Sequence, residues 1–304
     1  MKESLKKFVP AGMWRQIRKH FILHDHKRVA ALCDSYIDAF FSSGDKLFYA
    51  APKKNLVGKK IIWQYWAQGF NGQLPEVVRV CLDSVDRNKG DYEVIRLSDE
   101  TIDEYVNIPE YVWAKRGHGF SVTAFSNVLR LALLYTYGGV WLDATVLLTD
   151  SLPDDYTHYD FFMFQRDENE QHKEYWEQSY AYYWGWGPKF RVRVLTSIIF
   201  AKASSEFLGN YLNLLLYVWK TNEEYPFYFT FQILYNQLLE SGISAPDCPI
   251  VSDCPPHYLM QVINDSGFYM DAEEVMGQCV MHKLTFKELD MDRFNLLIGR
   301  SFVG

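Results

Sequence analysis

The sequence has few cysteines, and their spacing forms no framework. The five cysteines among 304 residues are odd in number and scattered, with no CxxC pair. This scarcity excludes a disulfide scaffold and favours a reducing compartment, so we expect a cytoplasmic protein. Cys248 and Cys254 lie near Asp247, Asp253 and His257. Their spacing matches no standard zinc motif, and we interpret them as ordinary loop cysteines.

The chain also lacks a long uncharged apolar run. No segment reaches the roughly 18 residues that a membrane-spanning helix requires. The first twenty residues hold six Lys or Arg and no apolar core, which does not fit a signal peptide. Apolar residues make up 48% of the chain and charged residues 23%, so wholesale disorder is excluded.

Positive charge is scarce beyond the first thirty residues. Residues 1–30 hold eight Lys or Arg against two acids, a local charge of +6, whereas the whole chain carries −7. The acidic remainder argues against a nucleic-acid partner. The basic segment predicts either an amphipathic helix at an anionic membrane surface or a solvated helix packed on the body. Its apolar residues are Phe8, Met13, Trp14, Ile17, Phe21 and Ile22.

Residues 121–137 predict a buried helix with one polar stripe. The segment is apolar almost all round. Its exceptions recur at i, i+3, i+4 and i+7, which places them on one side of a helix. These exceptions are Thr123, Ser126, Asn127 and Arg130.

A glycine break and a buried strand follow this helix. Gly138 and Gly139 end it. The run 140–148 is too apolar on both faces for anything but a central strand. Asp143 lies in the middle of that run, where an unpaired ionised carboxylate would cost several kcal/mol. We therefore interpret Asp143 as a residue that holds a cation or the polar groups of a ligand.

Strand and helix patterns alternate before this segment. A strand pattern covers 60–66, a helix begins at Pro75, and a second strand pattern covers 92–97. This alternation predicts an α/β fold with a mostly parallel sheet and helices on both of its faces. A polar link near residues 51–55 separates the fold from a helical start, so we expect an extension over 1–57 and a main domain over 58–304.

The second half of the chain is less regular. A strand pattern covers 194–201, helix patterns cover 206–220 and 229–240, and the tail carries the run 280–284 after a turn that contains glycine. A short helix is also expected after Ser98, which has acidic residues in its first turn. Ligands of such sheets bind outside the carboxyl ends of the strands. Gln64, Trp66, Ser98, Asp99, Asp143 and Thr145 are expected there.

Four segments together resemble a known family. They are KKIIWQYWAQG, the helix P-x-V-x-x-C-x-x-S, AFSNVLRLALLYTYGGVWLDATVLL and the late HKLTFK. The chain resembles the bacterial capsular polysaccharide synthesis proteins, which belong with the DXD-type, family 32-like glycosyltransferases. That larger group includes yeast mannosyltransferases and the clostridial glucosylating toxins. The resemblance covers residues 58–150 strongly and 151–290 loosely, and leaves the first 57 outside.

The resemblance implies a GT-A fold, a nucleotide-sugar donor and a divalent cation, Mn²⁺ or Mg²⁺. It implies that the nucleotide sugar is contacted by two residues of the first strand and by three residues of the family's S-D-x-x-R helix motif. It also implies contacts from the glycine turn, from the start of the strand that follows, and from a late lysine. It further implies a metal site from the aspartate of the DXD motif and a late histidine. The donor residues are Gln64, Trp66, Ser126, Asn127, Arg130, Gly138, Gly139, Trp141 and Lys283, and the metal residues are Asp143, Thr145 and His282.

Two positions depart from the family pattern. Asn127 replaces the carboxylate of the helix motif, and an amide cannot accept a proton or offset the charge of a cation. Thr145 holds the last position of DXD, where a hydroxyl is a poor ligand for Mg²⁺ or Mn²⁺. Asp143, Arg130 and Asn127 are the expected catalytic residues. Two alternatives remain open: Arg130 as a structural partner of Asp143, and His282 as an exposed loop residue.

The chain is rich in aromatic residues, which make up 17% of it. The densest cluster lies between residues 175 and 188, in a glycine-containing region. Core packing and a platform for an acceptor sugar explain this cluster equally well. The candidate acceptor residues are Tyr183, Trp184 and Trp186.

Three functions follow from the resemblance. The first is transfer of a sugar from a UDP-hexose, with retention, to a polyprenyl-linked capsular or exopolysaccharide unit at the inner face of the cell membrane. The second is an inactive nucleotide-sugar-binding subunit of a synthesis complex, which Asn127 and Thr145 suggest. The third is a glycosyltransferase that modifies protein. The basic N-terminal segment favours the first.

Overall fold

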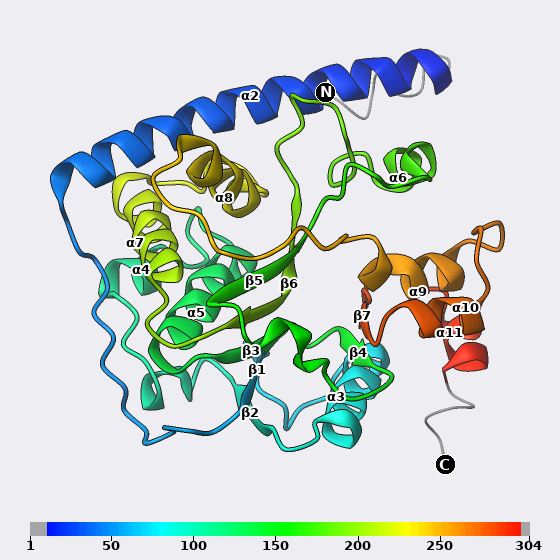
Figure 1. The fold of residues 1–304 in the computed structure, drawn as a ribbon, viewed down its shortest axis with the longest axis horizontal. Coiled ribbons are helices and arrows are strands. Elements are labelled where there is room, and N and C mark those ends of the chain that lie inside the picture. The colour runs from blue at the N-terminus through cyan, green and yellow to red at the C-terminus, as the bar shows by residue number, and fades with distance from the viewer. Residues whose placement is uncertain (1–10, 299–304) are drawn as a thin grey trace.

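The computed structural model describes residues 11–298, and their centre is a mixed five-stranded sheet (Figure 1). The strand order is β2-β1-β3-β6-β5. β1 pairs in parallel with β2 and β3, whereas β6 is antiparallel to both β3 and β5. Four strands therefore share one direction, which confirms the expected mostly parallel sheet. The strands are β1 (Ile61–Tyr65), β2 (Glu93–Leu97), β3 (Gly139–Leu142), β5 (Phe161–Gln165) and β6 (Val194–Ala201).

Helices cover both faces of this sheet, as the sequence predicts. In β1, Trp63 and Tyr65 point into the larger core with α5, and Ile62 points into the core on the opposite face. This alternation follows from the period of two in a strand. The helices are α3 (Glu76–Asn88), α4 (Glu110–Lys115), α5 (Val122–Tyr137), α6 (Lys173–Ser179), α7 (Glu206–Thr221) and α8 (Thr230–Ser241).

The N-terminal helix α2 (Ala11–Ser43) lies across α8 and α7 at the top of Figure 1. Val29, Cys33 and Phe40 are buried in the same core as the body, so the second half of α2 packs by its apolar side. The helix ends at Ser43, and the chain then runs without regular structure to β1. No described helix has the length and apolarity to span a bilayer. Lys2, Lys6, Lys7 and Phe8 of the basic segment lie outside the described residues.

The strand expected over 140–148 is wrong as a single element. It breaks at Asp143 into β3 and β4 (Val146–Leu148), which belong to different sheets. The carbonyl of Asp143 accepts a hydrogen bond from the amide of Val146 at 2.9 Å, which closes a turn between them. β4 then pairs antiparallel with β7 (Met281–Lys283). Asp143 therefore lies at the carboxyl end of β3 and not inside a strand.

Three further helices surround the small β4–β7 sheet on the right of Figure 1. They are α9 (Pro255–Asn264), α10 (Ala272–Gln278) and α11 (Met291–Leu297). The helix expected after Ser98 is wrong in its start: a turn in which the Ser98 amide donates to Thr101 Oγ1 comes first. A 3₁₀ helix, η1 (Ile102–Glu104), follows, and a second one, η2 (Asp154–Tyr156), precedes β5.

Candidate active site

Asp143 is the centre of the candidate site. Its backbone amide donates to the carbonyl of Ser197 in β6 at 2.9 Å, which fixes the start of the turn after β3. Its side chain is 25% exposed, so the carboxylate faces partly into the protein and partly into solvent. This position, at the carboxyl end of a central strand, is where ligands of such sheets bind.

Three donors from three elements meet this carboxylate. Oδ1 accepts from Arg130 Nη2 of α5 at 3.2 Å and from Trp141 Nε1 of β3 at 2.8 Å. Oδ2 accepts from Lys283 Nζ of β7 at 3.2 Å. Burial raises the pKa of Asp143, but the positive charges of Lys283 and Arg130 outweigh burial and hold this pKa well below its usual range. Asp143 is therefore ionised at neutral pH.

Arg130 is anchored by the polar stripe of α5. Its guanidinium donates to the carbonyl and the hydroxyl of Ser126 at 3.2 and 3.1 Å and to the carbonyl of Thr196 in β6. Cζ lies 5.0 Å from the centre of the Trp141 ring. The side chain is 3% exposed, so burial lowers its pKa while Asp143 raises it. Arg130 thus does pair with Asp143, as one of the two interpretations of the sequence predicts.

Asn127, the third residue of the expected helix motif, lies on the same stripe but does not touch Asp143. Its side chain faces the hydroxyl of Tyr225 and is 6% exposed. Burial raises the pKa of Tyr225. The position that carries a carboxylate in the family pattern is therefore a buried amide beside a neutral phenol, and the described contacts assign Asn127 no chemical step.

Lys283 and His282 point in opposite directions from β7. Lys283 Nζ donates to Thr145 Oγ1 at 2.6 Å as well as to Asp143. His282 is fully buried, and its Nε2 lies 3.2 Å from Thr149 Oγ1. Alternation along a strand separates the two side chains. The structure thus brings Thr145 and Lys283 to Asp143, leaves His282 away from it, and contradicts the interpretation of His282 as an exposed loop residue.

These residues do not fit a resident divalent cation. Asp143 is the only carboxylate of the cluster, and both of its oxygens already accept from cationic donors. Thr145 accepts from the same lysine, and the fully buried His282 faces Thr149. Within residues 11–298 no three His, Cys, Asp or Glu side chains gather as a metal would need. Mg²⁺ and Mn²⁺ prefer several oxygen ligands, whereas this cluster presents the guanidinium of Arg130 and the ammonium of Lys283.

Trp66 lies next to this site, whereas Gln64 does not reach it. Trp66 packs against a small apolar cluster that includes Ala144, the residue after Asp143, and its ring meets that of Phe286 edge to face at 5.5 Å. Gln64 is buried, and its Oε1 accepts from Arg96 Nε of β2 at 3.0 Å. Only Trp66 presents an aromatic edge near the site.

Gly138 and Gly139 lie at the start of β3, at the end opposite Asp143. Gly139 has φ +102°, and a Cβ there would lie 2.5 Å from the Ile61 carbonyl oxygen. At Gly138, with φ +72°, a Cβ would lie 2.8 Å from the amide nitrogen of Ala203. The glycines allow the end of α5 to approach β1 closely. They support the sheet, and the structure does not bring them to the site.

The aromatic cluster is tied to the protein interior by a buried ion pair. Arg166 and Asp253 are both fully buried and form two bonds, at 2.9 and 3.0 Å. The same guanidinium donates to the carbonyls of Tyr183 and Gly185, both at 3.1 Å. Its Cζ lies 4.4 Å from the centre of the Trp184 ring. The loop is therefore held from inside, and core packing explains most of its aromatic surface.

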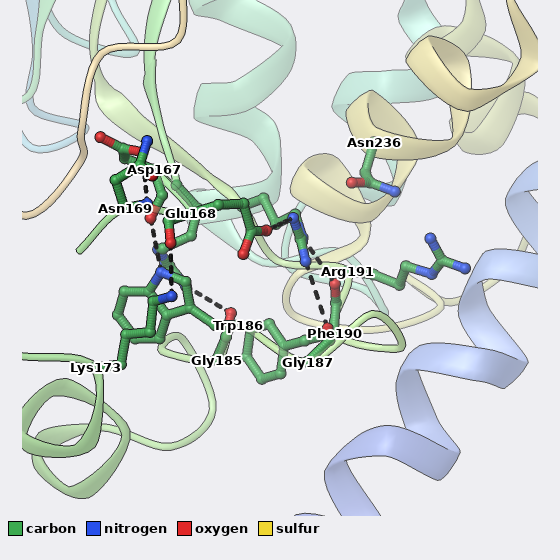
Figure 2. Close-up of polar contacts among 12 residues, drawn as sticks. Asp167, Glu168, Asn169, Lys173, Gly185, Trp186, Gly187, Phe190, Arg191 and Asn236 are labelled. Atoms are coloured by element: carbon green, nitrogen blue, oxygen red, sulfur yellow. Dashed lines mark hydrogen bonds and ion pairs between the residues drawn. The ribbon is translucent and has the colours of Figure 1, made fainter. Parts of the chain in front are cut away.

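Polar contacts hold the outer side of the same loop. Trp186 Nε1 donates to the carbonyl of Asp167 at 2.8 Å, and Arg193 bonds both Glu168 and the carbonyl of Phe190. These bonds join the segment after β5 to the segment before β6, and Figure 2 shows Trp186 beside Asp167 and Glu168. Tyr183, Trp184 and Trp186 are each at most 8% exposed. As acceptor residues they are therefore available only where Trp184 and Trp186 line cavities.

Some contributors to the site were not predicted from the sequence. Thr196 and Ser197 act through backbone carbonyls, which no side-chain pattern can indicate. Tyr228 is 62% exposed and lies close enough to Asp143 and Arg130 to interact with them electrostatically. Its only signal is its place just before the helix pattern at 229–240.

Comparison with known proteins gives one clear match. The family described as "Capsular polysaccharide synthesis protein" matches residues 14–296. The match begins inside α2. Most of this helix therefore belongs to the family match, although the sequence predicts that the first 57 residues lie outside the resemblance. The solved structure titled "PaToxG Glycosyltransferase" is 14% identical over 75% of this chain and 80% of its own, with a TM-score of 0.36, a similarity too low to support a conclusion. No curated protein matches the chain.

Proposed function

The chain belongs to the family of capsular polysaccharide synthesis proteins, and from this premise we propose that it is a glycosyltransferase with a GT-A fold over residues 58–304. The donor is a nucleotide-diphosphate sugar, a UDP-hexose. The acceptor is a glycan on a polyprenyl-linked capsular or exopolysaccharide unit at the inner face of the cell membrane.

One observation carries the proposal: two cations from distant elements converge on one partly exposed carboxylate. Arg130 and Lys283 together carry a charge of +2, and Asp143 neutralises only one of these two charges. The excess positive charge faces the carboxyl end of the sheet, where the diphosphate of a nucleotide sugar binds in α/β folds. Lys283 is 23% exposed and is the cation that a ligand can reach.

The reaction needs stabilisation of the leaving diphosphate as the sugar becomes cationic. Lys283 meets the phosphate oxygens directly, and Arg130 adds a fixed positive charge behind Asp143. Asp143 then accepts hydrogen bonds from sugar or ribose hydroxyls with the part of its carboxylate that faces solvent. Trp66 and Phe286 provide an aromatic edge for the base. Among residues 11–298 no second carboxylate contacts Asp143. We therefore infer that the acceptor hydroxyl attacks the anomeric carbon on the face from which the diphosphate leaves, with retention. The new glycosidic bond forms as the bond from sugar to phosphate breaks, and the proton of the hydroxyl passes to the departing phosphate oxygen.

The test is calorimetric titration of UDP and GDP, each in EDTA and in Mn²⁺. We expect UDP to bind, in EDTA as well as in Mn²⁺. Lys283→Met should weaken binding about ten- to a hundredfold, since a hydrogen bond to a charged group contributes roughly 1.5–3 kcal/mol. Lys202→Met is the matched control, because Lys202 pairs with Asp160 at the other end of the sheet.

Asp143→Asn should abolish transfer from UDP-hexoses to a lipid-linked acceptor. Equal binding of UDP by the Lys283 variant would overturn the proposed donor site. Binding that appears only with Mn²⁺ would overturn the metal-free arrangement. A second function, an inactive donor-binding subunit, is favoured by the buried amide of Asn127, and binding of UDP-hexoses without any turnover would support it.

A further inference from the structure

A cavity lies between α2 and the aromatic loop, apart from the Asp143 site. Its volume is about 560 Å³, within the range of small-molecule sites. It is bounded by the N-terminal half of α2 on one side and by α6 and residues 181–190 on the other. None of its lining residues contacts Asp143. Its apolar wall is formed by Ile22, Leu23, Ala181, Trp184, Pro188 and Phe190.

The rim of this cavity is positively charged. Arg15, Arg18, Lys19 and Lys189 line it, against two carboxylates, Glu174 and Glu177. Lys19 pairs with Glu177 at 3.2 Å, which leaves an excess of positive charge. Arg18 Nε is buried and has no hydrogen-bond partner among the described residues. A buried donor without an acceptor is costly, and an anionic ligand would satisfy it.

Apolar side chains are exposed on the same stretch of α2. Met13 is 57% exposed and Phe21 36%. Exposed apolar side chains and basic side chains thus share the stretch of α2 that borders the cavity.

The cavity is also close to the candidate active site along the chain. Phe190 lines the cavity, and six residues later the carbonyl of Thr196 binds Arg130. Six extended residues span at most about 20 Å. The wall of the cavity at Phe190 therefore lies within about 20 Å, along the chain, of a residue that contacts Arg130.

We propose that this cavity binds the hydrocarbon chain of a polyprenyl phosphate, with the phosphate at Arg18. The mostly apolar wall favours a hydrocarbon chain over a free sugar or nucleotide, and the basic rim favours an anionic head over a neutral or cationic one. This inference rests on the proposed function, because it identifies the lipid end of the acceptor.

The test uses farnesyl phosphate as the probe and the fluorescence of the cavity tryptophan, Trp184, as one readout, with calorimetry as the other. We expect binding of farnesyl phosphate, weaker binding of farnesol, and no binding of dodecyltrimethylammonium. Arg18→Gln and the cavity-filling Ala181→Phe should each weaken binding at least tenfold. Lys27→Gln, an exposed cation of α2 outside the cavity, should leave it unchanged.

The outcomes separate the two proposals. Equal affinity for farnesyl phosphate in the unmodified protein and in both cavity variants would overturn this inference, as would no binding at all, even if UDP still binds. Binding that depends on Arg18, in a protein that binds no UDP, would support the lipid site and overturn the proposed function. Displacement of farnesyl phosphate by vesicles of anionic phospholipid would identify a membrane lipid as the occupant and overturn the acceptor assignment.

Discussion

Replacing Arg166 by Met should be among the most destabilising single changes in the described part of the chain. The guanidinium is fully buried, and Met would remove its two bonds to Asp253 and its two bonds to the carbonyls of Tyr183 and Gly185. Asp253, also fully buried, would keep the hydroxyl of Tyr183 as its side-chain donor. Breaking such a pair by removing one partner costs about 3–5 kcal/mol.

The assay is urea unfolding followed by tryptophan fluorescence, with the free energy taken from linear extrapolation. A loss of this size should lower the midpoint of thermal unfolding on the order of 10 °C. The double variant Arg166→Met with Asp253→Leu should recover part of the loss, because no unpaired charge then remains in the core. A single-variant loss below about 1 kcal/mol would refute the reasoning, since the ion pair would then not be what holds the loop.

Three further predictions follow from the structure. Burial lowers the pKa of His282 to about 4 from its usual 6.5, so the unfolded chain binds this proton first and the free energy of unfolding should fall as the pH drops from about 6.5 to about 4. Urea unfolding should show that the free energy of His282→Gln depends less steeply on pH across this range, with a slope smaller by up to one proton. Gly139→Ala should lower the free energy of unfolding by about 1–3 kcal/mol, because the new Cβ meets the Ile61 carbonyl at positive φ, whereas Gly277→Ala, with open space around it, should not destabilise. Trp141→Phe keeps an aromatic ring beside Arg130 but removes the hydrogen bond to Asp143, so it should lower kcat/KM for a UDP-hexose at least tenfold and leave the unfolding midpoint near its original value. An unchanged kcat/KM would show that the orientation of Asp143 does not matter.

Elements with local start and stop signals are predictable from the sequence. β6 covers the expected residues 194–201, and α8 lies within one residue of the expected 229–240 and ends before Gly242, which has a left-handed conformation. The helix α5 begins after Ser121, whose side chain accepts from the amide of Ala124, and ends at Gly138. In each case the signal and the structure lie within a few residues of each other, so tertiary context has little to override.

The break between β3 and β4 had no such signal. The run 140–148 is apolar throughout, and apolarity alone cannot distinguish one strand in one sheet from two strands in two sheets. The turn at residues 143–146 contains neither Gly nor Pro. The pairing of β4 with β7, more than a hundred residues away, decides the outcome.

The candidate site was predictable only in part. Asp143, Arg130 and Lys283 are each site residues in the resemblance and lie together in the structure, but the pairing of Arg130 with Asp143 is the alternative interpretation of the sequence. His282 and Lys283 are neighbours in a strand, and only one of them can face the carboxylate. The pairing of Arg166 with Asp253 joins residues 87 positions apart, without any local pattern to announce it. Such contacts depend on topology, which the order of residues does not display.

The two cationic residues of the site lie at very different distances from Asp143 along the sequence. Arg130 is 13 residues from Asp143, whereas Lys283 is 140 residues away. Closing the longer loop costs about 2 kcal/mol more in chain entropy, and contacts of such separation form late in folding. During refolding, the helix and strand with the first cation should form before the second cation arrives. Nucleotide binding should therefore return in a slower phase than helical structure, and the site itself reports the completion of the fold.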